Sequence, residues 1–372
     1  MIRILISVIE NISKTSGTTV RARSIARILG NKFDVFLVTR ANSIDDVLMV
    51  SLGIEKNSIK VVRPEREKLW NVKLIPIILS NRFHVVYCVA DVFGFFTYYI
   101  LSKFLKYKII FEAHSLMYKE MKQISKLKTV ISYLLEVFIA SNADAVIALS
   151  GITYSFYKRF NKNTFFIPVF IDVKQFEREH KNKHVLGKVV GLIGPFDILP
   201  NKDQLDFLYA NMDKFDKRIR FRIIGKCNKR LINTRIEYTG YLKSTKDYVK
   251  AISELDALLV PARFATYGTK NKIIEAMACG IPVFATWNAV KGLDFVENFK
   301  NIVICEEDQL INIVNECIFD ERFMKEISLN AWNTIKKYYS IDIYKNKILY
   351  ILHKILKSKE VISELELNKL KF

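Results

Sequence analysis

The segment best suited to chemistry covers residues 258–287 and reads LLVPARFATYGTKNKIIEAMACGIPVFATW. It predicts a strand, a loop, a helix that begins near Thr269, a glycine turn and a second strand. The free N–H groups and the positive dipole end at the start of such a helix suit a phosphate. Lys270 and Lys272 add positive charge there, and the Glu275 carboxylate can accept hydrogen bonds from two ribose hydroxyls. The alternative is a structural helix with a solvated glutamate and solvated lysines, and periodicity alone does not decide between the two.

The elements around this segment form two series of short apolar strands that alternate with helical patterns, which is typical of parallel sheets with crossover helices. The strands are expected at 2–8, 35–39, 85–89, 108–112, 145–149 and 164–168, and then at 189–193, 221–224, 236–238, 257–260, 283–285 and 302–305. The sequence therefore predicts an α/β fold of two doubly wound halves. Ligands of such sheets bind beyond the carboxyl ends of the strands, so the site is expected in a cleft between the halves.

The expected boundaries place an N-terminal doubly wound domain at 1–175 and a C-terminal one at 186–340. Between them, 176–186 is polar and charged, as a linker would be. The tail over 341–372 has an apolar stripe of helical period and is expected to pack back on the N-terminal domain.

Composition narrows the class of protein. The chain has 372 residues, half of them hydrophobic, and a formal net charge of +20. This charge favours phosphates of nucleotides, lipids or nucleic acid, but the basic residues are dispersed without aromatic-basic motifs, so no nucleic-acid partner is expected. The five scattered cysteines lack metal or redox spacing. The first apolar run predicts a strand rather than a signal peptide, and no run is long enough to span a membrane, so the protein is expected in the cytoplasm.

The run KIIEAMACGIPVFAT at 272–286 resembles the donor-site signature of the family 4 retaining glycosyltransferases, which have the two-domain GT-B fold. Other pieces occur in the family's order: FEAHS at 111–115, ADAVIALS at 143–150, FIPVFIDVKQF at 166–176, GLIGPFDILPNK at 191–202, FRIIG at 221–225 and IEYTGY at 236–241. The resemblance covers nearly the whole chain and is most specific in the second half.

The resemblance implies roles for the donor-site residues. Glu275 corresponds to the carboxylate that binds the donor ribose, and Gly268 and Thr269 to the loop that touches the sugar and the diphosphate. Tyr267 stands where the family usually has a second glutamate that contacts a sugar hydroxyl. A branch of the family has a Gly-x-x-Asn-Lys pattern instead, which Gly268, Asn271 and Lys272 fit.

Three further positions are candidates. The family's early arginine in the second domain is missing, so Lys202, with Lys270, is expected to stabilise the leaving diphosphate; an exposed structural lysine is the alternative. His114 follows an expected strand and resembles the family histidine that reaches toward the donor sugar. Gly17 and Thr18 match a loop where backbone approaches the donor, although an ordinary turn has the same pattern. The nearby Arg21 is expected to be exposed.

A basic amphipathic helix is expected over 118–135, with lysines beside an apolar stripe. Together with 70–79 and 93–108, it is the candidate surface for an anionic membrane. The alternative is a helix packed on the core with a solvated lysine edge.

These patterns predict a retaining glycosyltransferase that moves a hexose from a UDP- or GDP-linked donor to a lipid-linked or growing glycan acceptor. It is expected to act peripherally on the inner face of the cell membrane. The nucleotide sugar is a co-substrate, and no metal or other cofactor is expected, since the sequence has no Asp-x-Asp motif. Two alternatives stay open: a sugar-nucleotide epimerase or hydrolase on the same fold, and a basic membrane- or polyanion-binding protein with a vestigial donor site.

Overall fold

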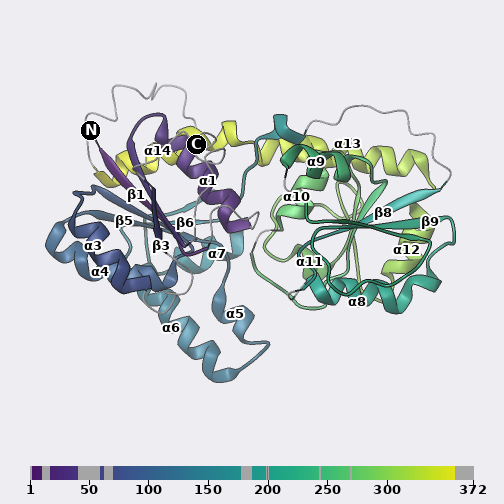
Figure 1. Ribbon diagram of the computed structural model, residues 1–372, viewed down its shortest axis with the longest axis horizontal. Coiled ribbons are helices and arrows are strands. Elements are labelled where there is room, and N and C mark those ends of the chain that lie inside the picture. The colour runs from purple at the N-terminus through teal and green to yellow at the C-terminus, as the bar shows by residue number, and fades with distance from the viewer. Residues whose placement is uncertain are drawn as a thin grey trace. The chain divides into compact units, whose positions relative to one another are not determined.

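The computed structural model describes residues 2–10, 17–40, 59–62, 70–176, 187–197, 199, 201–242, 244–268 and 270–356 (Figure 1). The chain forms two compact units. The first comprises Met1–Val169, Tyr267–Thr269 and Asp342–Phe372, and the second comprises Phe170–Thr266 and Lys270–Ile341. The first unit therefore ends earlier than the expected boundary at 175 and includes a short piece of the loop around Gly268.

The first unit is built on a parallel sheet that has seven strands among the described residues, in the order β3-β2-β1-β4-β5-β6-β7. Its strands are β1 (Arg3–Val8), β2 (Asp34–Arg40), β3 (Ile59–Val62), β4 (Val85–Val89), β5 (Lys108–Ala113), β6 (Ala145–Ala148) and β7 (Thr164–Phe166). The sequence did not predict β3. The central strands β1, β4, β5 and β6 are buried almost throughout, as expected for strands covered on both faces.

Helices cover both faces of this sheet: Figure 1 shows α1 and α14 on one side and α3, α4 and α6 on the other. The helices are α1 (Gly17–Gly30), α3 (Trp70–Leu79), α4 (Val92–Leu105), α5 (Met117–Met121), α6 (Lys126–Asn142), α7 (Gly151–Tyr157) and α14 (Ile341–Leu356). The stripe of α14 is buried, including Ile348 and Leu352, as its period predicted. Asp91 caps α4 by accepting the Gly94 N–H at 2.8 Å.

The single helix expected over 118–135 is wrong. The structure has two helices there, because α5 ends at Met121 and Ser125 caps a new helix by accepting the Lys128 N–H. The buried Glu136 of α6 then accepts the N–H groups of Met117 and Tyr118 at 2.7 and 3.2 Å, which ties the start of α5 to α6. Burial raises the pKa of Glu136 to about 7, although these two hydrogen bonds oppose the shift.

The second unit is built on a parallel sheet with the order β10-β9-β8-β11-β12-β13 within the described ranges. Its strands are β8 (Lys188–Ile193), β9 (Ile219–Ile224), β10 (Ile236–Gly240), β11 (Ala257–Val260), β12 (Val283–Thr286) and β13 (Val303–Cys305). Its α-helices are α8 (Asn201–Asn211), α9 (Thr245–Ser253), α10 (Asn271–Ala278), α11 (Trp287–Val290), α12 (Leu310–Cys317) and α13 (Glu321–Tyr338), and Val173–Phe176 and Met212–Lys214 are short 3-10 helices. Apolar side chains of β8, β9 and β11 pack against α8 and α12 in a core separate from that of the first unit.

Candidate donor and acceptor sites

Glu275 is positioned by α10, the helix that follows β11 in the second unit. The helix begins at Asn271 with Lys270 as its N-cap, two residues later than Thr269, so Glu275 lies in its second turn. The Glu275 side chain is buried, and Tyr248 of α9 donates its hydroxyl to Oε2 at 2.6 Å. Burial raises the pKa of Glu275, against the effects of Tyr248 and Lys272. The interpretation of Glu275 as a solvated surface residue is therefore wrong.

Lys272 was expected to add positive charge beside a bound phosphate, with a solvated lysine as the alternative, but protein oxygens surround its ammonium group instead. Its Nζ donates to the Ile193 carbonyl at 2.6 Å, to Asn201 Oδ1 at 2.7 Å and to Gln204 Oε1 at 3.0 Å. These three bonds use all the donors of an ammonium group. Burial, with the charge of Lys270, lowers the pKa of Lys272 to about 7. Lys272 thus fastens the first turn of α10 to the end of β8 and the start of α8.

The carboxyl ends of β8 and β9 come close together at two glycines. A Cβ atom on Gly225, whose φ is +122°, would lie 2.3 Å from the Gly194 carbonyl oxygen, and one on Gly194 would lie 2.6 Å from the Asn201 side chain. Only glycine fits this approach. Lys202 lies exposed in the first turn of α8 beside this edge of the sheet.

The loop after β11 contains the other predicted donor-site residues. Thr269 lies outside the described residues. Lys270 donates from Nζ to the Thr266 carbonyl at 3.1 Å. Tyr267 and Gly268 belong to the first unit, where the Tyr267 N–H donates to Glu120 Oε1 at 3.1 Å and a Cβ on Gly268 would lie 3.2 Å from the His114 carbonyl oxygen. The structure thus brings Gly268 next to His114.

Arg263 is a cation of the second unit that the sequence reasoning missed. It follows β11 at the carboxyl edge of the sheet, and its Nε donates to Glu307 Oε1 at 2.9 Å. Its backbone N–H donates to Asp203 Oδ2 at 3.2 Å. The signal was its place directly after an expected strand, inside the segment that also contains Glu275.

Glu112, the last but one residue of β5, is the centre of a buried polar network in the first unit. Arg21 Nε donates to both of its oxygens at 3.1 Å, and the Tyr87 hydroxyl donates to Oε2 at 2.6 Å. Burial alone would raise the pKa of Glu112, but the Arg21 charge and the hydrogen bonds of His114 and Tyr87 lower it to about 2. Arg21 is 1% exposed, so the expectation of a surface arginine is wrong.

His114 lies just beyond β5, as predicted, and is directly bonded to this network. Its Nε2 lies 2.8 Å from Glu112 Oε1, and its side chain is 18% exposed. Since Glu112 is ionised above pH 2, its oxygen accepts and His114 Nε2 carries the proton. His114 Nδ1 is then the ring nitrogen that can accept a hydrogen bond. Gly17 and Thr18 were expected in a loop before the helix, but they form the first turn of α1, where Gly17 is exposed and Thr18 partly exposed.

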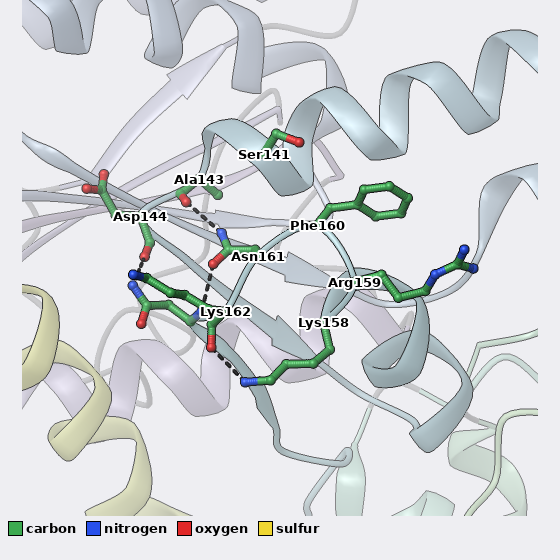
Figure 2. A pocket seen from close by; sticks show the side chains of 9 residues that line it. Ser141, Ala143, Asp144, Lys158, Arg159, Phe160, Asn161 and Lys162 are labelled. Atoms are coloured by element: carbon green, nitrogen blue, oxygen red, sulfur yellow. Dashed lines mark hydrogen bonds between the residues drawn. The ribbon is translucent and has the colours of Figure 1, made fainter.

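A surface pocket of about 550 Å³ lies elsewhere in the first unit, at the amino ends of β6 and β7 (Figure 2). Its polar groups bond one another: Asn161 donates to the Ala143 carbonyl at 2.7 Å, and Lys158 donates to the Lys162 carbonyl at 2.7 Å. Ligands of parallel sheets bind at the carboxyl edge of the sheet. This pocket lies at the amino ends of its strands, so it is not a candidate ligand site.

Residues 187–319, which include Glu275, Lys272 and Arg263, match the sequence model of the family described as "Glycosyl transferases group 1". The chain carries a glycosyltransferase domain. The predicted enzyme class is therefore confirmed. A comparison with curated proteins found no match.

Solved structures of similar fold cover nearly the whole chain. Anabaena Alr3699/HepE in complex with UDP and glucose is 16% identical with a TM-score of 0.77, covering 95% of this chain and 100% of its own. Sucrose-phosphate synthase from Thermosynechococcus elongatus is also 16% identical with a TM-score of 0.77, covering 96% and 100%. An S. aureus TarM mutant in complex with fondaparinux, alpha-GlcNAc-glycerol and UDP is 13% identical with a TM-score of 0.67, covering 96% and 100%. The predicted GT-B fold is confirmed.

Proposed function

We propose that this protein is a family 4 retaining glycosyltransferase that moves a hexose from a UDP-linked donor, with GDP as the alternative, to a lipid-linked or growing glycan at the inner face of the membrane. The observation that carries the proposal is the buried Glu275 carboxylate, held by Tyr248 at 2.6 Å near the start of a helix at the carboxyl edge of the sheet.

The donor half of the proposal rests on the second unit. Tyr248 occupies Glu275 Oε2, and Oε1 binds a ribose hydroxyl. The N–H groups at the start of α10 and the backbone at Gly194 and Gly225 bind the diphosphate, because a helix start and glycine turns both favour phosphate oxygens. Similar folds are described with UDP-glucose in Alr3699/HepE and with UDP in TarM, which supports UDP as the nucleotide.

In the proposed catalytic step, cations stabilise the leaving group and His114 contacts the donor sugar. The bond between the anomeric carbon and the UDP oxygen breaks, and an acceptor hydroxyl bonds to that carbon on the same face. Its proton passes to the departing phosphate. Lys202 and Lys270 stabilise the charge that develops on the diphosphate. His114 Nδ1, set by the bond from Nε2 to Glu112, accepts a hydrogen bond from a hydroxyl of the donor sugar.

The proposed acceptor is held at a membrane. No helix of the described residues is long and apolar enough to cross a membrane. A similar fold is described as the lipopolysaccharide outer core galactosyltransferase WaaB, with 15% identity and a TM-score of 0.66. This neighbour and the basic net charge of +20 support an acceptor on an anionic lipid surface.

The test is product analysis with radiolabelled UDP-glucose, UDP-galactose and UDP-GlcNAc, each with and without a lipid extract as acceptor. The proposal expects label in the lipid fraction from one donor, dependent on the extract and abolished by Glu275→Ala, with Glu316→Ala of α12 as the control. Free hexose or an epimerised nucleotide sugar without acceptor would instead establish the hydrolase or epimerase. No turnover, with no effect of any sugar nucleotide on the melting temperature, would favour a binding protein with a vestigial site.

A further inference from the structure

Three neighbouring helices of the first unit expose apolar side chains to solvent. On α6, Leu127, Val130, Ile131 and Leu134 recur at helical spacing, and Leu127 is 70% exposed. On α4, Phe93, Ile100 and Phe104 are also exposed at helical spacing, and Phe104 is 77% exposed. On α3, the exposed residues are Val72, Ile75 and Leu79. The apolar stripe of α6 is therefore not packed on the core, which removes the alternative that periodicity left open.

The three helices that carry these stripes pack side by side. Helix α4 contacts both α3 and α6. Phe138 of α6 stacks on Phe96 of α4 with ring centroids 5.2 Å apart, and its edge meets Tyr99 at 5.3 Å. Figure 1 shows α3, α4 and α6 on the same side of the first sheet. We call the exposed residues of these helices the apolar surface.

The charges on these helices are of one sign. Lysines accompany each stripe: Lys73 on α3, Lys103 and Lys106 at the end of α4, and Lys126 and Lys128 on α6. The only acidic side chain of the three helices is Glu136, which is buried. Lys126 and Lys128 adjoin Leu127 in sequence, so they lie on either flank of the α6 stripe.

We propose that this surface docks the protein on a bilayer of anionic phospholipids. Exposed leucine, isoleucine and phenylalanine side chains enter the boundary between headgroups and acyl chains, while the flanking lysines bind lipid phosphates. A protein partner would also cover apolar residues, but the absence of any exposed acid on these helices matches an anionic surface. The inference deepens the proposed function by naming the surface that meets the membrane of the acceptor. Docking itself needs neither donor nor acceptor.

The experiment is vesicle flotation of the full chain with phosphatidylcholine vesicles that contain or lack phosphatidylglycerol. The wild type is expected to float only with phosphatidylglycerol. Lys126→Gln/Lys128→Gln weakens binding by about 5-fold for each lysine, on the order of 25-fold for the pair. Leu127→Ser/Leu134→Ser weakens it at least as much, because the apolar contact is lost. Binding by charge alone would not respond to the leucine substitutions.

Matched controls come from exposed residues elsewhere. Lys217→Gln/Lys325→Gln removes the same charge, and Leu329→Ser/Ile343→Ser removes two exposed apolar side chains. The proposal is overturned if the wild type does not float, if the controls lose as much binding as the test variants, or if light scattering shows a dimer that Leu127→Ser/Leu134→Ser dissociates without changing flotation. The melting-temperature shift with UDP is measured on the same variants. Retained flotation without any UDP response contradicts the proposed function and leaves the docking surface supported.

Discussion

Glu112 Oε1 and His114 Nε2 lie 2.8 Å apart at the carboxyl end of β5, and Glu112 is also bonded to the buried Arg21. Two positions apart on one extended chain, these side chains share a face of the strand. Strand β5 and Arg21 hold the Glu112 carboxylate in place, and the carboxylate orients the His114 ring. His114 is thus held in one orientation and one tautomer before any ligand binds.

Substitution Glu112→Gln is expected to lower kcat for sugar transfer by roughly 10- to 100-fold, the effect of losing one hydrogen bond to a charged group. The glutamine amide keeps the size of the side chain but not its charge, so the tautomer of His114 is no longer set. Steady-state kinetics check this, with KM for the donor expected to change less than kcat. Wild-type kcat in Glu112→Gln, together with an inactive His114→Ala, would contradict the positioning role.

Substitution Arg21→Met is expected to lower the free energy of unfolding by about 3–5 kcal/mol, because it leaves the Glu112 carboxylate buried without its cation. The double variant Arg21→Met/Glu112→Leu removes both charges and should recover most of that loss. Urea denaturation measures both. Arg27→Met, an exposed position on the same helix, is the control. An equal loss of unfolding free energy in Arg21→Met and Arg27→Met would refute the buried pair as the cause.

The decrease in the free energy of unfolding at acid pH should depend on Glu112. Its pKa is about 2 in the folded protein and 4.5 ordinarily, so its contribution is complete above pH 4.5. The contribution is lost as the pH falls from 4.5 toward 2, because the unfolded chain then binds the proton first, and it amounts to about 3 kcal/mol. Denaturation at pH 3 and pH 6 should show a smaller difference for Glu112→Gln than for the wild type. Equal differences would contradict this assignment.

Donor binding should weaken on the acid side at a pH above the usual carboxylate range. Burial raises the pKa of Glu275, and the protonated carboxyl accepts ribose hydroxyls less well. Because the Tyr248 hydrogen bond opposes that rise, Tyr248→Phe should move the acid limb of UDP affinity to higher pH. Calorimetric titration across pH 4–7 checks this. Tyr209→Phe, which breaks a bond to Tyr238 instead, should leave the limb in place; a limb unmoved by Tyr248→Phe would be evidence against Glu275 as the ribose ligand.

Lys272 should make stability rise with pH in the neutral to alkaline range. Its pKa is lowered to about 7, below that of an unfolded lysine, so the unfolded chain binds more protons above pH 7. Stability should therefore rise between pH 7 and 9 by up to about 1.4 kcal/mol per pH unit. Lys272→Met should remove this slope and lower the melting temperature, because three acceptor oxygens lose their donor. Lys217→Met should do neither, and an unchanged slope in Lys272→Met would exclude Lys272 as its source.

The sequence predicted the strands well because alternation of short apolar runs with helical patterns is set by local residue choice. All twelve expected strands exist, with bounds shifted by a few residues. Strand β3 was missed because its four residues, IKVV, include a lysine and lie in the charged stretch EKNSIKVVRPEREK. Helices α5 and α6 were merged because their stripes continue in period across Ser125, whose capping role depends on local geometry.

The candidate sites show where local patterns fail. The burial of Arg21, and its bond to Glu112 91 positions away, depends on how α1 packs against β5. The same holds for Lys272, whose acceptors lie 68 to 79 positions away. A spacing rule reaches only neighbours in sequence, so it predicted an exposed Arg21 and a Lys272 beside a bound phosphate, without the bonds that hold either side chain. His114 and Glu275 were singled out because each lies inside a motif, and their roles stay predictions.

The most direct test of the central claim is isothermal titration of UDP, GDP and ADP into the wild type, Glu275→Ala and the control Glu316→Ala. The account predicts selective binding of UDP that Glu316→Ala retains and Glu275→Ala loses by roughly 10- to 100-fold. Equal affinity of the wild type and Glu275→Ala for UDP, or no binding of any nucleotide by a folded wild type, would contradict it.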